Sequence, residues 1–439
     1  MQETIVAIAT PPGKGGVGVI RISGESARLI GEKVAGKKLE PRYATYAEFR
    51  SNKNEAIDSG LALFFPGPNS FTGEDVVELQ GHGGPVIQDL MIKEVVALGA
   101  RQARAGEFSQ RAFLNDKIDL TQAEAIADLI DSSTEQAAKG AIRSLQGEFS
   151  AKIHSLLQEL IHLRMYVEAA IDFPDEEIDF LADEKIRTSI EALQQSLSNT
   201  ITQAGQGAIL RNGLRLVIAG KPNAGKSSLL NQLAGQESAI VTDIPGTTRD
   251  IVTETIDIDG LPVHIIDTAG LRESHDTVEK IGIERARKAI EDADHVLLLL
   301  DASEASAVDW ADYPELDVDK TSVVFNKIDL IPSSSIKDQI RVSAKTAYGL
   351  DDLKSYIKGI AGYAQENETV FTARRRHITA LSQADQAVQR GLYQLKTYNA
   401  GELLADELLQ AQESLNQITG DFTADDLLGE IFSGFCIGK

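Results

Sequence analysis

Apolar residues follow different spacings in different parts of the chain. In residues 1–117, short apolar runs such as 17–22 and 60–65 alternate with turns rich in Gly and Pro, which predicts an α+β domain with several strands. In residues 118–209, and again from 363 onward, apolar residues recur every three or four positions, which predicts long amphipathic helices. The remaining segment alternates between predicted strands and helices and so predicts an α/β domain.

These patterns predict a multidomain protein with a discontinuous helical domain. We assign residues 1–117 to an N-terminal α+β domain, 118–209 and 363–439 to two parts of one α-helical domain, and 210–362 to an α/β domain inserted between those parts. One domain can be inserted into another when the two ends of the inserted domain lie close together, and domains of this α/β class have such ends. A length of 439 residues with 42% hydrophobic content allows several cores.

The most specific motif lies near the start of the inserted domain. Residues 220–227, Gly-Lys-Pro-Asn-Ala-Gly-Lys-Ser, fit the phosphate-binding loop, and they stand between an apolar strand and a helix start, as that motif requires. Backbone N–H groups and the helix N-terminus would hold phosphates. Lys226 would reach the β- and γ-phosphates, and the Ser227 hydroxyl would bind Mg²⁺. The candidates here are Asn223, Ala224, Gly225, Lys226, Ser227 and Ser228.

Further motifs, most of them at the ends of predicted strands, indicate that the nucleotide is GTP. Asp267 can hold the Mg²⁺ shell while the Gly270 N–H meets the γ-phosphate, and the Asp329 carboxylate can accept two guanine N–H donors, which rejects adenine. Thr248 is expected to bind Mg²⁺. The candidates in these motifs are Asp267, Thr268, Ala269 and Gly270; Asn326, Lys327 and Asp329; Ser343, Ala344 and Lys345; and Thr242, Asp243, Ile244, Pro245, Gly246, Thr247 and Thr248. The inserted domain is therefore predicted to be a Ras-like P-loop GTPase domain.

One position departs from the Ras pattern. Leu271 stands where Ras-like enzymes place the glutamine that orients the attacking water, and a leucine cannot do this. Another polar group must act instead, although each nearby charge also has the plainer interpretation of a solvated surface residue. The nearby candidates are Arg249, Arg272, Glu273, Asp276 and Glu279.

Composition limits the contact with RNA and indicates the compartment. The net charge is −23, whereas nucleic-acid binders normally present a basic face, so we expect any RNA substrate to be held mainly by a partner. No apolar run approaches the roughly 18 residues of a membrane helix, and the first residues lack a signal-peptide pattern. A single cysteine excludes an intrachain disulfide. We therefore expect a cytoplasmic protein without a membrane contact.

Taken together, these motifs resemble the family of tRNA modification GTPases called MnmE or TrmE across essentially the whole chain. The segments that carry the resemblance are 4–7 (Thr-Ile-Val-Ala), 10–18 (Thr-Pro-Pro-Gly-Lys-Gly-Gly-Val-Gly), 21–24 (Arg-Ile-Ser-Gly), 105–115, 172–176 (Asp-Phe-Pro-Asp-Glu), 246–250 (Gly-Thr-Thr-Arg-Asp), 267–272 and 435–439 (Phe-Cys-Ile-Gly-Lys). Because other GTPases share the central motifs, the two chain ends make the resemblance specific.

The resemblance implies an N-terminal domain that binds a tetrahydrofolate of the 5-formyl or 5,10-methylene type and forms a homodimer. By that resemblance, Arg21, Glu78, Lys117 and Lys439 would contact the folate. An arginine or lysine can pair with the glutamate tail, and a carboxylate can accept two N–H donors from the pterin. From the residues alone, surface ion pairs remain the alternative.

The resemblance also implies a K⁺ ion that offsets the missing glutamine. Its ligands would be Asn223, Thr242, Ile244 and Thr247, and Glu279 would orient the attacking water through a second water. Cys436 would lie near the folate as a nucleophile or general acid, unless it is simply a small buried apolar residue. The partner would be the FAD protein MnmG, in a heterotetramer or larger complex that adds carboxymethylaminomethyl or aminomethyl groups to the wobble uridine of tRNA.

Two other functions remain open at this point. A ribosome-assembly GTPase would share residues 210–362 but would usually add a basic RNA-binding module, which is not visible here. A GTP-dependent interaction switch without further chemistry would explain the helices but not the folate-like N-terminus or Cys436.

Overall fold

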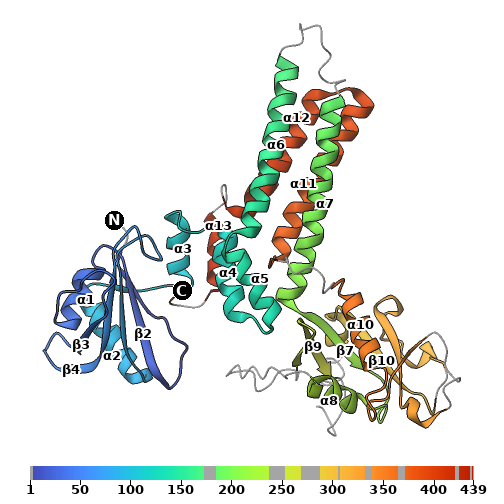
Figure 1. Ribbon diagram of the computed structural model, residues 1–439, viewed down its shortest axis with the longest axis horizontal. Coiled ribbons are helices and arrows are strands. Elements are labelled where there is room, and N and C mark those ends of the chain that lie inside the picture. Colours follow the sequence, from blue (N-terminus) through green and yellow to red (C-terminus); the bar gives the residue numbers. More distant parts are fainter. Residues whose placement is uncertain are drawn as a thin grey trace. The chain divides into compact units, whose positions relative to one another are not determined.

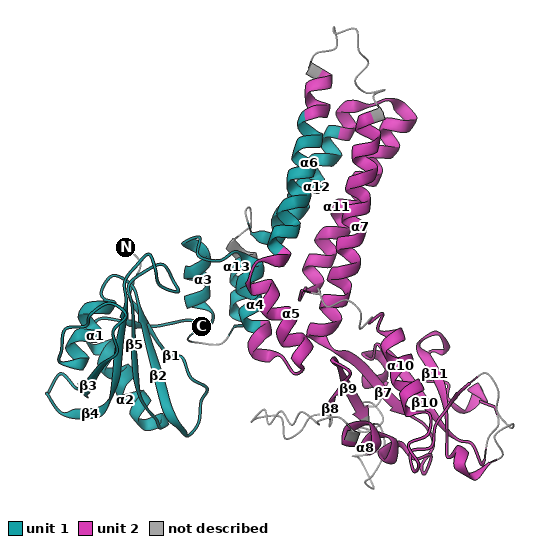
Figure 2. Ribbon diagram, in the orientation of Figure 1, with its two compact units in different colours: residues 1–127, 150–165, 405–439 teal, residues 128–149, 166–404 magenta. Residues whose placement is uncertain are grey.

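The structure, a computed structural model, describes residues 3–172, 184–236, 253–267, 287–304, 307–331, 339–363, 371–420, 425–435 and 438. The chain divides into two compact units. Unit 1 comprises residues 1–127, 150–165 and 405–439, and unit 2 comprises 128–149 and 166–404 (Figure 2). These units do not correspond one to one with the three domains assigned above, whose boundaries stay predictions.

The N-terminal part of unit 1 is a six-stranded sheet in the order β3-β4-β5-β2-β1-β6. The strands are β1 (Ile5–Ile8), β2 (Gly15–Ser23), β3 (Thr45–Arg50), β4 (Ala56–Phe65), β5 (Val76–Gly83) and β6 (Arg101–Gln102). Helices α1 (Ala27–Ala35) and α2 (Pro85–Ala97) bury the apolar residues of one sheet face, including Ile22 and Val77. Because strand side chains alternate between faces, Arg21 and Glu78, which lie opposite each other in the register, point to the other face.

Part of that second face is covered by α3 (Glu107–Leu114). Its Phe108 is fully buried against Ile5, Ala7 and Ala103. Near the other chain end, α13 (Asp425–Ser433) places Leu428 and Phe432 in a core shared with α4 (Leu120–Asp131). The C-terminal part of the chain thus packs within the same unit as the N-terminal sheet.

The remaining helices flank the α/β domain in the sequence. They are α5 (Glu135–Leu145), α6 (Glu148–Asp172), α7 (Glu184–Asn212), α11 (Arg375–Tyr398) and α12 (Gly401–Thr419). Within unit 2, α7 and α11 pack along each other although they lie on opposite sides of the α/β domain in the sequence (Figure 1). Among the described residues, no helix is long and apolar enough to cross a membrane.

The α/β domain in unit 2 has a six-stranded sheet in the order β12-β11-β10-β7-β9-β8. Its strands are β7 (Leu214–Ala219), β8 (Thr253–Ile258), β9 (Leu261–Asp267), β10 (His295–Asp301), β11 (Thr321–Asn326) and β12 (Ile340–Arg341). All neighbours are parallel except β8, which pairs antiparallel with β9 at the edge. Helices α8 (Lys226–Gln236) and α10 (Leu350–Ile360) cover one face, where Leu229 and Leu353 enter the core.

Helix α7 runs almost directly into the central strand of this sheet. Only Gly213 separates Asn212, the last residue of α7, from Leu214, the first of β7. Gly213 has φ +69°, and a Cβ atom there would lie 2.6 Å from the His264 ring. His264 Nε2 donates to the Asn212 carbonyl oxygen at 3.0 Å, and burial lowers the pKa of His264. The junction therefore has little room for movement.

The predicted fold class is confirmed: a multidomain chain with an N-terminal α+β domain, helices before and after an α/β domain, and the P-loop motif inside that domain. The apolar strand predicted directly before the phosphate-binding motif is present as β7 (Leu214–Ala219).

Candidate functional site

The phosphate-binding motif joins the end of β7 to the first turn of α8. Gly225 has φ +92°, and a Cβ atom there would lie 2.3 Å from Asn326 Nδ2, so only glycine fits. Lys226 is 8% exposed, and its Nζ donates to the carbonyl oxygens of Gly220 and Lys221 at 2.8 and 2.9 Å. The ammonium group is thus folded back over the loop that would hold the phosphates.

The predicted base-recognition motif contacts this loop directly. Asn326, which is 1% exposed, donates from Nδ2 to the Ala224 carbonyl oxygen at 2.8 Å and accepts from the Ala344 N–H at 3.0 Å. Ser343 donates from Oγ to Asp329 Oδ1 at 2.7 Å. The structure therefore brings together the motifs of Ala224, Asn326 and Ala344, the first and last of which are more than 100 positions apart in the sequence.

Lys327 has a partner that was not predicted. Its backbone is left-handed, with φ +63°, and its Nζ lies 2.7 Å from Asp301 Oδ2 at the end of β10. Burial raises the pKa of Asp301, but the hydrogen bonds from Lys327 and Ser303 outweigh it, so that this pKa is lowered. The sequence carries a signal for Asp301, because it directly follows a run of apolar residues, as Asp267 and Asn326 do.

Several predicted residues lie outside the described residues. They are Thr242, Asp243, Ile244, Pro245, Gly246, Thr247, Thr248, Arg249, Thr268, Ala269, Gly270, Arg272, Glu273, Asp276, Glu279, Cys436 and Lys439. Asp267 is the last residue of β9. Asn223, Ser227, Ser228 and Lys345 are exposed.

Among the residues that the structure does describe, no three His, Cys, Asp or Glu side chains form a metal-binding group.

A second site is centred on Arg21 and Glu78 in the N-terminal sheet. Glu78 Oε1 accepts from Arg21 Nε and Nη2 at 3.0 and 2.9 Å, and the two side chains are 20% and 16% exposed. The Arg21 guanidinium carbon lies 5.6 Å from the ring centroid of Phe71 and 5.9 Å from that of Phe108. A cation, a carboxylate and two aromatic rings therefore meet on one face of the sheet.

The C-terminal tail reaches this site. Arg21 Nη1 donates to the Gly438 carbonyl oxygen at 3.3 Å. Gly438 has φ +99°, and a Cβ atom there would lie 2.3 Å from the Ile8 carbonyl oxygen. The tail therefore lies against the end of β1 at a position that only glycine can occupy.

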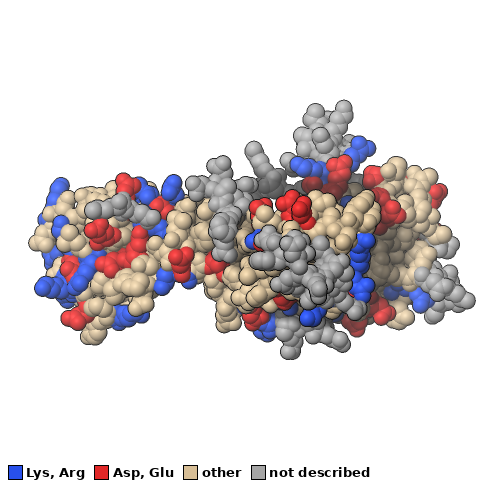
Figure 3. Space-filling model, turned by 90° about the horizontal axis from the view of Figure 1, so that it is seen from above, with Lys and Arg blue, Asp and Glu red and all other residues tan. Residues whose placement is uncertain are grey.

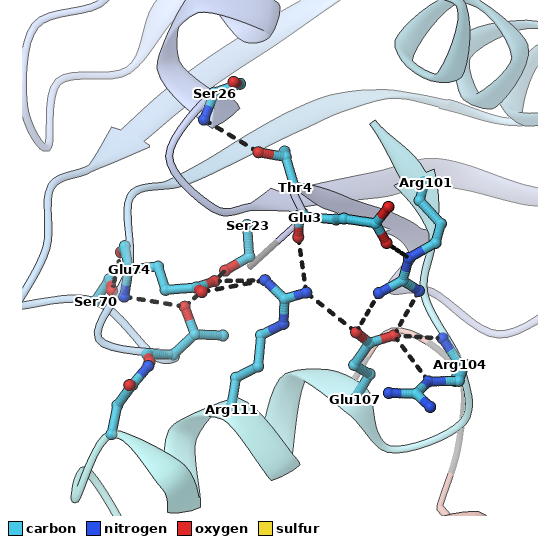
Figure 4. A network of polar contacts seen from close by, with 12 residues as sticks. Glu3, Thr4, Ser23, Ser26, Ser70, Glu74, Arg101, Arg104, Glu107 and Arg111 are labelled. Carbon is cyan, nitrogen blue, oxygen red and sulfur yellow. Dashed lines mark hydrogen bonds and ion pairs between the residues drawn. The ribbon is translucent and has the colours of Figure 1, made fainter. Parts of the chain in front are cut away.

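A partly buried ionic network ties α3 to neighbouring segments of the N-terminal domain (Figure 4). Arg111 Nη1 donates to both oxygens of Glu74 at 3.1 and 3.0 Å, and Ser23 Oγ donates to Glu74 Oε2 at 2.7 Å. Arg111 and Arg101 also donate to Glu107, at 3.1 and 2.7 Å. The network joins α3, which carries Phe108, to the loop that follows Phe71. This network was not predicted from the sequence, because ion pairs between distant segments leave no pattern in the local sequence.

The charges in this network shift the pKa of Glu107. Glu107 is 3% exposed, and burial alone would raise the pKa of its carboxyl. Hydrogen bonds from Arg101, the Arg104 N–H and Arg111 outweigh that effect and hold the pKa at about 2. Burial lowers the pKa of Arg101, but its bonds to Glu107 and Glu3 raise it further than burial lowers it. The network stays ionised across the physiological pH range.

Lys117 is exposed and lies close to the same loop. A Cβ atom at Gly73 would lie 3.4 Å from Lys117 Cδ and Cγ, which places its stem beside the 70–75 loop. The next residue of that loop, Glu74, belongs to the ionic network. Three of the four residues predicted to bind folate are thus described, and all three lie in the N-terminal domain.

Acidic and basic side chains are interspersed on the face shown in Figure 3, and no large basic area is visible among its coloured residues. That distribution agrees with the net charge of −23.

Comparisons with known proteins cover the whole chain. A family model described as GTP-binding protein TrmE N-terminus matches residues 4–117, and one described as MnmE helical domain matches 120–436. The chain is 56% identical over 452 residues to the tRNA modification GTPase MnmE of Pseudomonas fluorescens, covering 100% of this chain and 99% of that protein. It is 57% identical over 450 residues to the MnmE of Pseudomonas aeruginosa, with the same coverage.

A solved structure also shows some likeness. The G domain of the T. maritima FeoB iron transporter is 28% identical, with a TM-score of 0.25, over 34% of this chain and 98% of that one.

Proposed function

Because the chain belongs to the MnmE family of tRNA modification GTPases, we propose that its GTPase activity is stimulated by K⁺ and drives modification of the wobble uridine of tRNA. In this proposal the one-carbon unit comes from a tetrahydrofolate bound in the N-terminal domain. The chain acts as a homodimer with MnmG, which supplies the FAD chemistry and most of the grip on tRNA. The full-length match favours this function over ribosome assembly or a non-catalytic switch.

The observation that carries the proposal is the site around Arg21. The Arg21 guanidinium, which lies near the rings of Phe71 and Phe108, and its partner Glu78 supply the groups that a glutamate tail and a pterin would contact. In the structure Arg21 and Glu78 bind each other, and the cofactor would replace part of that pairing. A bound tetrahydrofolate would supply the one-carbon unit, while Arg21, Glu78 and Lys117 would bind and orient it.

The C-terminal tail gives this site a reactive group. Gly438 contacts Arg21, and Cys436 is two residues away in the sequence. Cys436 itself is outside the described residues, so its role as nucleophile or general acid rests on the family resemblance. Lys439 would lie next to the same contact.

In the GTPase domain, the loop that ends at Lys226 would hold the phosphates with its N–H groups. Ser227 and Thr248 would be ligands of Mg²⁺, and Asn223, with Thr242, Ile244 and Thr247, would be ligands of K⁺. Asn223 suits that role because it is exposed in the loop and has a left-handed backbone, with φ +64°. Both ions would spread the charge that develops on the phosphates during hydrolysis.

The potassium proposal is tested by measuring GTP hydrolysis in potassium and in sodium buffer. We expect a stimulation by K⁺ that Asn223→Ala abolishes. Asn54→Ala is the matched control, because Asn54 is also exposed with a left-handed backbone, φ +66°, but lies in the N-terminal domain. Equal rates in the two salts would overturn the potassium proposal and leave the GTPase assignment intact.

The folate proposal is tested by calorimetric titration of 5-formyltetrahydrofolate. Arg21→Gln and Glu78→Gln are each expected to weaken binding by about tenfold or more, since each removes a charged partner. The exposed Arg28–Glu32 pair of α1 offers a matched control in Arg28→Gln, which should bind normally. If the unsubstituted protein fails to bind the folate, the proposal is wrong.

A further inference from the structure

Each polar side chain of the Asn326-Lys327-x-Asp329 motif is held by a contact from another part of the domain. Asn326 is held by Ala224 and Ala344, and Asp329 by Ser343. Those contacts all lie within motifs that the sequence already indicates. The third contact, from Lys327 to Asp301, comes from outside every motif.

Asp301 is well placed to fix the Lys327 side chain. It is the last residue of β10 and lies opposite Asn326 in the parallel register with β11. The carboxyl ends of adjacent parallel strands form the edge at which α/β sheets bind ligands. The Asp301 side chain is 10% exposed and that of Lys327 is 33% exposed. Water therefore screens this pair less than it screens a surface pair.

The two oxygens of Asp301 have separate partners. Oδ2 accepts from Lys327 Nζ at 2.7 Å, while Oδ1 accepts from the Ser303 N–H at 2.9 Å and from Ser303 Oγ at 2.6 Å. The Ser303 contacts orient the carboxylate, so the ammonium group meets an acceptor that is already fixed. A lysine side chain without such a partner would sample many rotamers and would lose side-chain entropy when a ligand ordered it.

We propose that Asp301 is a positioning residue for guanine nucleotides: it fixes the Lys327 ammonium group, so that the apolar stem of Lys327 is already in place for the flat face of the base. Lysine commonly presents its methylene groups to an apolar surface while its charge is held at the tip. The inference rests on the proposed role of the Asn326-Lys327-x-Asp329 motif in guanine binding. It adds a residue that acts through Lys327 and does not itself touch the nucleotide.

The test is equilibrium binding of a fluorescent GDP analogue, together with steady-state GTP hydrolysis. Asp301→Asn is expected to weaken binding and raise KM about tenfold, while kcat at saturating GTP stays unchanged. Lys327→Met should weaken binding at least as much. In the Lys327→Met background, Asp301→Asn should cause no further loss, because a residue that acts through Lys327 has nothing left to position.

Asp259→Asn is the matched control, since Asp259 forms a similar ion pair with Lys358 elsewhere in the same domain. It should bind GDP normally.

Three outcomes would overturn the inference, and they differ in what they leave standing. If Lys327→Met binds GDP normally, the guanine-binding role of the motif fails as well. If Lys327→Met is impaired but Asp301→Asn is not, only the positioning role of Asp301 fails. If Asp301→Asn weakens binding equally in both backgrounds, Asp301 acts through the fold and not through Lys327.

Discussion

Thr134 Oγ1 donates a hydrogen bond of 3.0 Å to the carbonyl oxygen of Gly260. Thr134 caps the N-terminus of α5, where its Oγ1 also accepts from the Ala137 N–H. Gly260 lies in the two-residue turn between β8 and β9. In the sequence this hairpin connects the segment that carries Thr248 to the one that begins at Asp267. A helix outside the α/β sheet thus holds the hairpin between the two predicted Mg²⁺-binding segments.

The turn leaves no room for a larger residue. Gly260 has φ +92°, and a Cβ atom there would lie 2.5 Å from Gln136 Cγ and 3.0 Å from the Tyr363 hydroxyl. We expect Gly260→Ala to lower the free energy of unfolding of the α/β domain by about 1–3 kcal/mol, because both the backbone and the contacts are unfavourable. Urea denaturation would measure this.

Gly235→Ala is the control for that substitution. Gly235 lies in α8 with no atom within 4 Å of the added Cβ, so alanine there should be neutral or stabilise by about 0.5–1 kcal/mol. Equal effects of the two substitutions would contradict the tight fit of the turn.

Gly225→Ala should disrupt the nucleotide site more than the fold. The added Cβ would lie 2.3 Å from Asn326 Nδ2, which would break the hydrogen bond from Asn326 to Ala224. We expect at least a tenfold loss of GDP affinity, measured by fluorescence titration. A smaller loss would show that the Asn326 contact is not needed to shape the loop.

Glu107 should make stability depend on acidic pH. Its pKa is about 2 in the folded chain against an ordinary value of 4.5. Its stabilising contribution is therefore complete above about pH 4.5 and is lost as the pH falls towards 2. The shift corresponds to about 3 kcal/mol. Glu107→Gln should lower stability near neutral pH and flatten the decrease between about pH 5 and 2.

Glu135→Gln serves as the comparison for that pH dependence. Glu135 is an exposed carboxylate at the start of α5 that pairs with Lys139. Lys139 lowers the pKa of Glu135, but the pair is exposed to water, so Glu135→Gln should change the acid limb of the stability curve much less than Glu107→Gln does. If Glu107→Gln changes the acid limb as little as Glu135→Gln does, the network around Glu107 does not contribute to stability as described.

Gly438→Ala should affect the proposed folate site without affecting the GTPase site. A Cβ atom at 2.3 Å from the Ile8 carbonyl oxygen would push the tail away from β1 and remove its contact with Arg21. Affinity for 5-formyltetrahydrofolate is then expected to change severalfold, while the rate of GTP hydrolysis by the isolated protein stays the same. If folate binding is unaltered, the tail contact plays no part in that site.

The GTPase motifs could be predicted because each is short, local and attached to a strand end. Asn326 and Gly225 could be recognised without any knowledge of how closely they approach each other. The Glu74–Arg111 pair could not be predicted, and Asp301 could be recognised only as the end of an apolar strand, because which distant charge each one faces is not written in the local sequence. Arg21 and Glu78 were predicted as site residues from the family resemblance, but their pairing became visible only in the antiparallel register of β2 and β5.

The direct passage from α7 into β7 has a mechanical consequence. Helix α7 has 29 residues, and at 1.5 Å per residue it is about 43 Å long. With only Gly213 as the joint, a rotation of the central strand by about 5° would carry the far end of a rigid α7 through about 4 Å. The helix is thus a lever whose short arm is the strand that leads into the phosphate-binding loop. The His264 bond to Asn212 sets the angle at its pivot.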